Sequence, residues 1–361
     1  MTFDTSYNKI LEKLDKIDPV KYASSRNFID GAVTYLSPYI SRGVISTQQV
    51  LESVLAAGYK PYSMEKFIQE LAWRDYWQQL WIYNKHLIDN DLKQPQPNGA
   101  RAGMPSGIVS NQTGIEAIDK GIEALYETGY MHNHLRMYTA SVACNIAKCQ
   151  WKIPAQWMYY HLLDADWASN ALSWQWVCGA NSHKLYYANQ ENINKYCHTN
   201  QVGTFLDKGY EEFAQMDVPK SLSAIDFPKL TTPLPKTNVP QLDVDLPVLL
   251  YNFYNLDPNW RSDLNANRVL LLEPSVFEKY PVSQKSIDFC LALANDNIPN
   301  IKVWVAEFDE LQQLAQGEIY FKEHPLNNYV GKEDARTWLS DATGNFPSFF
   351  AFWKKCRKEI F

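Results

Sequence analysis

Residues 164–176 read DADWASNALSWQW, and no other stretch of the 361-residue chain says more about its fold. In a helix, Asp166, Asn170 and Trp174 would recur every four residues and lie on one face. A carboxylate, an amide and an indole that are buried together need polar partners, because an unpaired buried polar group destabilises the fold. The stretch therefore fits either a polar surface stripe beside a core Trp or the wall of a pocket for a large heteroaromatic ligand.

Residues 128–137, TGYMHNHLRM, contain a partner for these carboxylates. Asn133, Arg136 and Met137 share one helical face. Arg136 can pair with Asp164, since a buried carboxylate is stabilised by a charge-assisted hydrogen bond. An ordinary surface Arg beside a core Met remains the simpler interpretation.

Two more stretches mix polar and aromatic side chains. In residues 68–77, IQELAWRDYW, one helical face carries Glu70, Trp73, Arg74 and Trp77. A Glu–Arg pair at this spacing is common on exposed helices, whereas two indoles beside it are unusual. In residues 33–46, VTYLSPYISRGVIS, the hydroxyls of Thr34 and Ser37 can serve either a phosphate or a helix end.

Taken in order, the pieces VTYLSPYISRGVIS, ELAWRDYW, TGYMHNHLRM and LDADWASNALSWQW resemble the helical FAD-binding domain of the photolyase/cryptochrome flavoproteins. They span residues 33 to 176, and the general similarity covers about 1–215. The resemblance implies an all-helical domain that holds FAD. It places these residues at the cofactor: Tyr22, Thr34, Tyr35, Leu36, Ser37, Glu70, Arg74, Asn133, Arg136, Asp164, Asp166 and Asn170.

The resemblance also implies catalytic and substrate-binding roles. Asn170 matches the residue that faces flavin N5, and Trp174 and Trp151 match the first two members of a tryptophan chain that reduces the photoexcited flavin. Together with Glu70, these are the expected catalytic residues. The expected rim of a pocket for flipped-out damaged bases consists of Trp73, Asn133, His134, Met137 and Trp176.

The chain departs from the family pattern in three ways. No Trp lies between residues 82 and 150, where the outermost member of the tryptophan chain usually falls, so the chain either ends at Trp151, continues through a Tyr or takes another route. His134 stands where many photolyases have an Arg near DNA. The FAD domain starts at once, whereas the family's α/β antenna domain normally precedes it.

The second half of the chain has a different pattern. Residues 216–246 hold five prolines and predict an extended linker. Residues 247–361 alternate apolar runs with helical segments, which predicts a small α/β domain with a parallel sheet. Pieces of this part resemble antenna-type domains of bacterial photolyase relatives, which leaves a second antenna chromophore open. We expect a mainly α protein: a helical FAD domain at 1–215, a linker, and an α/β domain placed after it.

Composition narrows the class of protein. The chain is 46% hydrophobic and 20% charged, which excludes a largely disordered protein. Its net charge of −6 argues weakly against nonspecific duplex binding. No apolar run is long enough to span a bilayer and no secretory leader is present, so we expect a cytoplasmic protein without membrane contact. Six scattered Cys predict reduced core thiols, and seven His without an HExxH motif give no support for a metal site.

The sequence thus favours a blue-light-driven DNA photolyase, a carbon–carbon lyase that repairs cyclobutane pyrimidine dimers with FAD and binds damaged DNA. The alternative is a cryptochrome-like photoreceptor that signals through a protein partner without DNA repair. A light-independent flavoprotein is a third hypothesis, because fold similarity does not settle function.

Overall fold

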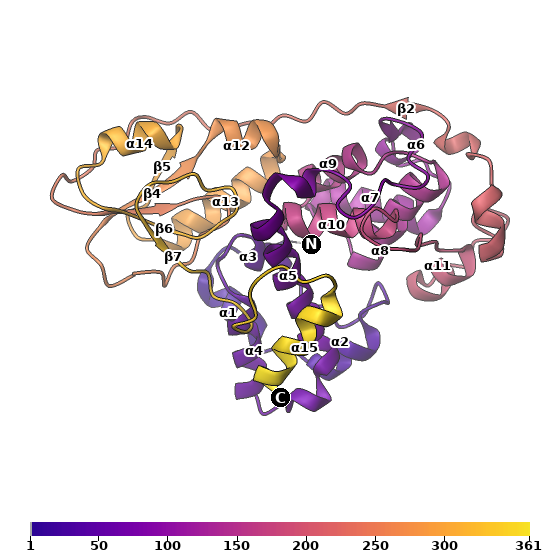
Figure 1. The fold of residues 1–361 in the computed structure, drawn as a ribbon, viewed down its shortest axis with the longest axis horizontal. Helices are drawn as coiled ribbons and strands as arrows, with labels where there is room; N and C mark the ends of the chain where they lie inside the picture. Colours follow the sequence, from indigo (N-terminus) through magenta and orange to yellow (C-terminus); the bar gives the residue numbers. More distant parts are fainter. Residues whose placement is uncertain (1) are drawn as a thin grey trace.

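The computed structural model describes residues 2–361, in which a helical region and a parallel sheet lie side by side (Figure 1). An extended segment runs from the far end of the helical region back to the sheet. The helices of the first region are α1 Tyr7–Leu14, α2 Pro19–Ser25, α3 Ser37–Ser41, α4 Thr47–Ala56, α5 Glu65–Asn84, α6 Ser106–Val109, α7 Glu116–Thr128, α8 Asn133–Ser141, α9 Lys152–His161, α10 Trp167–Val177 and α11 Gln190–Cys197.

The second region is built on five parallel strands in the order β5-β4-β3-β6-β7. The strands are β3 Val248–Tyr251, β4 Asn267–Leu272, β5 Lys302–Val305, β6 Ile319–Lys322 and β7 Lys332–Asp334. Its helices are α12 Pro274–Lys279, α13 Gln284–Asn297, α14 Phe308–Leu314 and α15 Phe349–Ile360. A separate antiparallel pair joins β1 Met104–Pro105 to β2 Ile225–Asp226.

The predicted fold class, mainly helical with a small parallel α/β unit, is confirmed. The apolar runs of this part of the sequence form β3, β4, β5 and β6, whereas β7 is a polar, mostly exposed edge strand without an apolar signal. The division at 1–215, 216–246 and 247–361 stays our proposal. The two regions share a core, in which the Trp81 ring of α5 lies 6.1 Å from Tyr254 and 6.2 Å from Tyr280, centroid to centroid.

Two local features differ from what the apolar pattern favours. Residues 155–177 contain no proline but do not form one helix, because the backbone turns extended at Leu162 and becomes helical again only after Asp166. The two aspartates of this turn are engaged by arginines of other helices, which explains the break. Before α7, the hydroxyl of Thr113 donates to Asp119, and Ile115 occupies the N-cap position.

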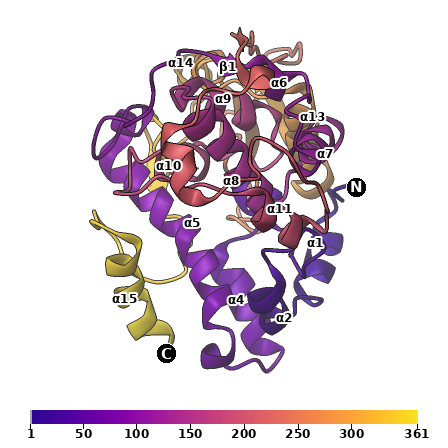
Figure 2. The same ribbon diagram turned by 90° about the vertical axis from the view of Figure 1, so that its right-hand side faces the viewer.

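The C-terminal arm, residues 335–361, leaves the sheet and runs along α5 of the helical region (Figures 1 and 2). The backbone N–H of Leu339 donates to Asp75 Oδ2 at 2.7 Å, and that of Gly344 donates to Gln79 Oε1 at 3.1 Å. At its end, α15 buries Phe349, Phe352, Trp353 and Cys356, which recur at helical spacing on one face. The arm therefore belongs to the helical region by packing.

The buried carboxyl of Asp75 predicts a measurable pH dependence. Burial raises the pKa of Asp75 from 3.8 to about 6, against the opposing effect of its hydrogen bonds from Leu339 and Thr47. A carboxyl whose native pKa is raised contributes stability that is complete below about pH 4 and is lost as pH rises through about 6. Between pH 4 and 7, the free energy of unfolding should fall by about 3 kcal/mol more in the wild type than in Asp75→Asn.

Urea unfolding across this pH range measures the difference. Asp15→Asn, which changes an exposed carboxyl, is the control and should follow the wild-type curve. Parallel curves for the wild type and Asp75→Asn would contradict the shifted pKa.

Candidate functional site

Two buried ion pairs form the centre of the candidate site. The turn between α9 and α10 places Asp164 against α8 and Asp166 against α5. Arg136 Nη2 lies 3.0 Å from Asp164 Oδ2, and Arg74 Nη2 lies 3.2 Å from Asp166 Oδ2. The side chains of the two aspartates are 5% and 2% exposed, so each carboxylate depends on its arginine for stabilisation. The predicted pairing of Arg136 with Asp164 is present.

The environment of Asp164 keeps it ionised and leaves one oxygen free. Burial alone would raise the pKa of Asp164, but the charge of Arg136, with help from the nearby Ser37, holds it below its usual value. Arg136 is itself fixed by a hydrogen bond from Nε to the carbonyl of Met131 at 2.8 Å. Within residues 2–361, Oδ1 of Asp164 is buried without a hydrogen-bond partner. A ligand N–H would satisfy this oxygen.

Asp166 has a full set of partners. Gln78 Nε2 donates to Oδ1 and Ser169 Oγ donates to Oδ2, both at 2.7 Å. The Arg74 guanidinium bridges this carboxylate to Ser41, donating to the Ser41 hydroxyl at 2.7 Å. The sequence interpretation missed Gln78 and Ser41. Gln78 could have been found, because it lies four residues after Arg74 on the same helical face.

The expected phosphate-side residues surround the start of α3. Ser37 is the first residue of α3, and Thr34 is half-buried just before it. Tyr35 has a left-handed backbone, with φ 54°, and its ring lies 5.2 Å from Tyr130. Leu36 is 2% exposed and belongs to the core, so only its backbone can serve a ligand.

Tyr22 and Glu70 lie on neighbouring helices. The Tyr22 ring packs edge-on against Phe67 at 5.1 Å, and burial followed by the nearby Glu70 charge raises the pKa of Tyr22 well above its usual value. Glu70 pairs with Arg26 Nε at 3.2 Å. Glu70 and Arg74 therefore do not pair with each other along the helix. Glu70 pairs with Arg26, and Arg74 pairs with Asp166.

Asn170 is half-buried on α10 with a fixed amide orientation. Its Nδ2 donates to the backbone carbonyl of Ala155 in α9 at 2.7 Å. The carbonyl oxygen of the amide therefore points away from α9. An Asp at this position would bring a carboxylate against that backbone carbonyl and lose the hydrogen bond.

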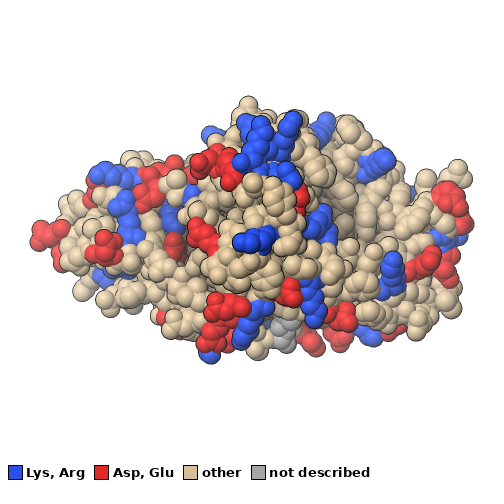
Figure 3. Space-filling view, turned by 90° about the horizontal axis from the view of Figure 1, so that it is seen from below, with Lys and Arg blue, Asp and Glu red and all other residues tan. Residues whose placement is uncertain are grey.

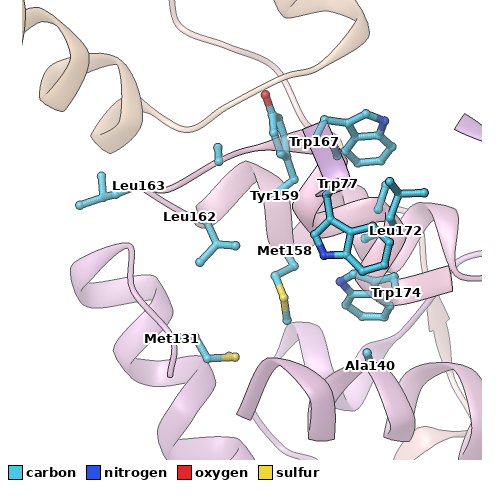
Figure 4. Close-up of a cluster of buried hydrophobic side chains, with 14 of the residues drawn as sticks. Trp77, Met131, Ala140, Met158, Tyr159, Leu162, Leu163, Trp167, Leu172 and Trp174 are labelled. Carbon is cyan, nitrogen blue, oxygen red and sulfur yellow. The ribbon is translucent and has the colours of Figure 1, made fainter. Parts of the chain in front are cut away.

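Trp174 and Trp151 are both 2% exposed, within the aromatic core of the helical region. Figure 4 shows Trp174 with Trp77, Trp167, Met158 and Tyr159 in one buried cluster. The rings of Trp151 and Trp167 lie 6.4 Å apart, and the Trp167 ring lies 5.6 Å from Tyr280. The aromatic network therefore continues from Trp151 toward the second region and not toward residues 82–150.

The expected substrate rim is partly covered. Trp176 is 38% exposed, and Met137 and Asn133 are also accessible to solvent. Trp73, however, stacks on Phe349 of the C-terminal arm, with ring centroids 3.7 Å apart and an interplanar angle of 8°. This face of the Trp73 ring is therefore unavailable to a base while α15 stays docked.

His134 is poorly suited to binding a phosphate. Its Nδ1 lies 2.8 Å from the backbone carbonyl of Asn27, which requires the proton to be on this nitrogen. Burial lowers the pKa of His134 below 6.5, and the hydrogen bond to Asn27 offsets only part of this effect. His134 is thus neutral at pH 7 and does not offer a positive charge to a phosphate.

Two further observations concern metals and membranes. In the part of the chain that the structure describes, no group of three or more His, Cys, Asp or Glu side chains has a metal-binding arrangement. Across residues 2–361, no helix combines the length and the apolar character needed to span a bilayer. All six cysteines are buried and form no disulfide.

Comparison with known proteins identifies the helical region. Residues 67–224, a little under half of the chain, match the family of the FAD binding domain of DNA photolyase. The deoxyribodipyrimidine photo-lyase of Alkalihalophilus pseudofirmus is 30% identical over 171 residues, and that of Synechococcus is 32% identical over 165 residues. These alignments cover 46% and 43% of this chain but only 36% and 34% of the relatives.

Among solved structures, a Synechocystis cryptochrome is similar with a TM-score of 0.48 and 24% identity, covering 54% of this chain and 44% of its own. The chain spans about a third of the length of the two curated relatives. Residues 67–224 of the helical region are thus similar to the FAD-binding domain of DNA photolyase, and the two relatives are similar over a comparable length.

The Arg136–Asp164 pair predicts a double-mutant effect on stability. Arg136→Ala leaves a buried carboxylate without its partner and should lower the free energy of unfolding by about 3 kcal/mol. Adding Asp164→Asn removes that charge and should recover at least about 1 kcal/mol. Urea unfolding at pH 7 measures both variants.

Arg26→Ala is the matched control, because Glu70 is 27% exposed whereas Asp164 is 5% exposed, so loss of the Arg26–Glu70 pair should cost about 1 kcal/mol or less. If the double variant is no more stable than Arg136→Ala, the buried charge is not the source of the loss.

Proposed function

We propose that this chain, whose residues 67–224 match the FAD-binding domain of photolyases, binds FAD and uses blue light to repair cyclobutane pyrimidine dimers in DNA. The family match supports FAD as the cofactor. The observation that carries the proposal is the free, buried Oδ1 of the ionised Asp164. This oxygen can accept a hydrogen bond from a ring N–H of a ligand.

The residues present fit the flavin nucleotide. Asp164 would accept from the ring, Arg136 would hold that carboxylate in place, and the amide oxygen of Asn170 would face the ring from α10. The hydroxyls and backbone N–H groups of residues 34–37, at the start of α3, would hold phosphate oxygens. Bound FAD would supply the light-driven electron that splits the dimer and then returns.

The protein's own tasks are binding, orientation and exclusion of water. Trp73 and Trp176 would stack on an extruded dimer, which costs least where base pairing is already broken. Trp174 and Trp151 would supply electrons to the cofactor from within a dry aromatic core. The burial of both indoles supports this role, because it keeps water away from each ring.

The exposed side of α15 supports DNA as a partner. Lys354, Lys355, Arg357 and Lys358 are all exposed there, in a protein whose net charge is −6. Figure 3, which views the molecule from the side where α15 lies, shows Lys and Arg side chains gathered in one patch. Such a patch can attract a phosphate backbone.

One observation favours a second function. Phe349 occupies the face of Trp73 that a damaged base would need, and this favours a photoreceptor that signals through a protein partner without repairing DNA. The two functions separate at α15: a photolyase must release this helix from Trp73, whereas a photoreceptor can keep it docked.

Illumination of the FAD-loaded protein with a dimer-containing oligonucleotide tests the first function. Blue light should restore the 260 nm absorbance of the intact pyrimidines, and darkness should not. The Asp164→Asn variant should bind FAD at least tenfold more weakly, because a neutral amide oxygen accepts a weaker hydrogen bond than an ionised carboxylate oxygen does. Full FAD binding by this variant would remove Asp164 from the site, and FAD binding without repair would support the photoreceptor.

The Phe349 contact generates a separate prediction. Phe349→Ala frees the Trp73 ring and should raise the affinity for a dimer-containing single strand about tenfold, since stacking of a base on an aromatic ring contributes about 1–3 kcal/mol. Fluorescence anisotropy measures the affinity. Phe350→Ala is the matched control, because Phe350 is the next residue on α15 and is 70% exposed. Equal affinities of the wild type, Phe349→Ala and Phe350→Ala for the strand would show that the stacking of Phe349 on Trp73 does not oppose substrate binding.

A further inference from the structure

A buried carboxylate joins the two regions at the end of the aromatic network. Asp89 is 9% exposed and is the last residue of the 3₁₀ helix Lys85–Asp89, which follows α5. The indole Nε1 of Trp167, the first residue of α10, donates to Asp89 Oδ1 at 2.7 Å. The hydroxyl of Tyr280, at the end of α12, donates to the same carboxylate and lies 3.1 Å from both oxygens. One carboxylate thus accepts from an indole and from a phenol.

The two rings at this carboxylate extend the aromatic path of the helical region. The Trp167 ring lies 6.4 Å from Trp151 and 5.6 Å from Tyr280, centroid to centroid. Both separations are within the range of aromatic rings in contact. Electron transfer slows steeply with distance, so contacts of this kind are what an electron path needs. Trp151, Trp167 and Tyr280 therefore form a continuous path that ends in the second region.

The hydrogen bond to Asp89 prepares Tyr280 to lose an electron together with a proton. An oxidised phenol is a very strong acid, so a buried tyrosine is oxidised only if a base takes its proton at once. Asp89 is within the hydrogen-bond reach that a general base requires. Burial, followed by the charge of Asp89, raises the pKa of Tyr280 well above its usual value, so the ring keeps its proton until it is oxidised.

The carboxylate lies close to solvent, although both rings are buried. Trp167 is 1% exposed and Tyr280 is 4% exposed. Lys279 Nζ lies 3.3 Å from Asp89 Oδ2, and the Lys279 side chain is 52% exposed. A proton that reaches Asp89 can therefore exchange with water beside Lys279, while the aromatic part of the path stays dry.

A second tyrosine at the same distance from Trp167 lacks such a base. The Tyr159 ring also lies 5.6 Å from Trp167, and Figure 4 shows both side chains in the buried cluster. The Tyr159 hydroxyl is 2.7 Å from the hydroxyl of Tyr254. A neutral phenol accepts a proton far less readily than a carboxylate does. Distance therefore does not distinguish the two tyrosines, but the hydrogen-bond partner does.

We propose that Tyr280 is the terminal electron donor of the aromatic path and that Asp89 accepts its proton. In this step Tyr280 gives one electron to the electron-deficient Trp167 and its hydroxyl proton to Asp89, and becomes a neutral radical. The electron passes through Trp151 and Trp174 to photoexcited, oxidised FAD, which is the oxidant. The inference rests on the proposed function, because that function supplies the oxidant. It gives the second region a redox residue that serves the helical region.

Flash illumination of the FAD-loaded protein, with the FAD oxidised and without DNA, tests this step. Each flash should produce a tyrosyl radical, recorded by electron paramagnetic resonance. Ring-deuterated tyrosine in the protein should narrow the signal, which distinguishes a tyrosyl radical from a tryptophan radical. A tryptophan radical alone would overturn this proposal and leave FAD binding intact. A protein that binds no FAD would overturn the proposed function, and this step with it.

Two variants separate the electron donor from the proton acceptor. Tyr280→Phe keeps the ring but has no hydroxyl, and should lower the yield of tyrosyl radical at least about tenfold. Asp89→Asn keeps a side chain of similar shape but removes the base, and should lower the yield at least about tenfold as well. The absorbance of bound FAD checks that each variant retains the cofactor. Full yield in Tyr280→Phe would overturn the proposal, and full yield in Asp89→Asn would overturn the role of Asp89.

Tyr159→Phe is the matched control. Both Phe variants lose one buried hydrogen bond, so both should lower the melting temperature to a similar extent. Only Tyr280→Phe should lose the radical, and a purely structural role of Tyr280 would not produce this difference. Equal loss of the radical in Tyr159→Phe and Tyr280→Phe would overturn the assignment of Tyr280 as the donor.

Discussion

The pairing of two buried aspartates with two arginines is the constraint on which the rest of the structure depends. Asp164 and Asp166 lie in one short turn, yet their partners come from α8 and α5. Removal of either arginine would leave a buried carboxylate without its charge partner, which is strongly destabilising. The turn therefore fixes how α5, α8, α9 and α10 meet, and it leaves one aspartate oxygen available at the centre of the helical region.

Part of the fold and of the candidate site could be predicted from the types and spacing of residues in the sequence. The Arg136–Asp164 pair follows from the chemistry of the two residues, and strands β3 to β6 follow from apolar runs. The break between α9 and α10 was not predictable, because its cause is long-range: the arginine that pairs with each aspartate is at least 28 positions away. Asn170 illustrates the same limit, since helical spacing puts it on the correct face but cannot show that Ala155 fixes its amide.

The surface on which the C-terminal arm docks could not be predicted from the sequence. The apolar spacing of Phe349, Phe352, Trp353 and Cys356 predicts a helix with one buried face, but it contains no information about which surface receives that face. The structure shows that the receiving surface is α5, beside Trp73. A helix that follows the sheet in sequence thus completes the helical region, and the substrate side of the candidate site is defined by residues from both ends of the chain.

The same long helix also joins the C-terminal arm to the turn between α9 and α10. Arg74 and Gln78 hold Asp166 from α5, while Arg136 holds Asp164 from α8. Gln78 Oε1 accepts from Arg336 of the arm at 2.7 Å, and Gln78 Nε2 donates to Asp166 Oδ1 at 2.7 Å. A single glutamine amide therefore connects the arm to one of the two buried carboxylates, so a change in the position of the arm would reach the candidate site through this side chain.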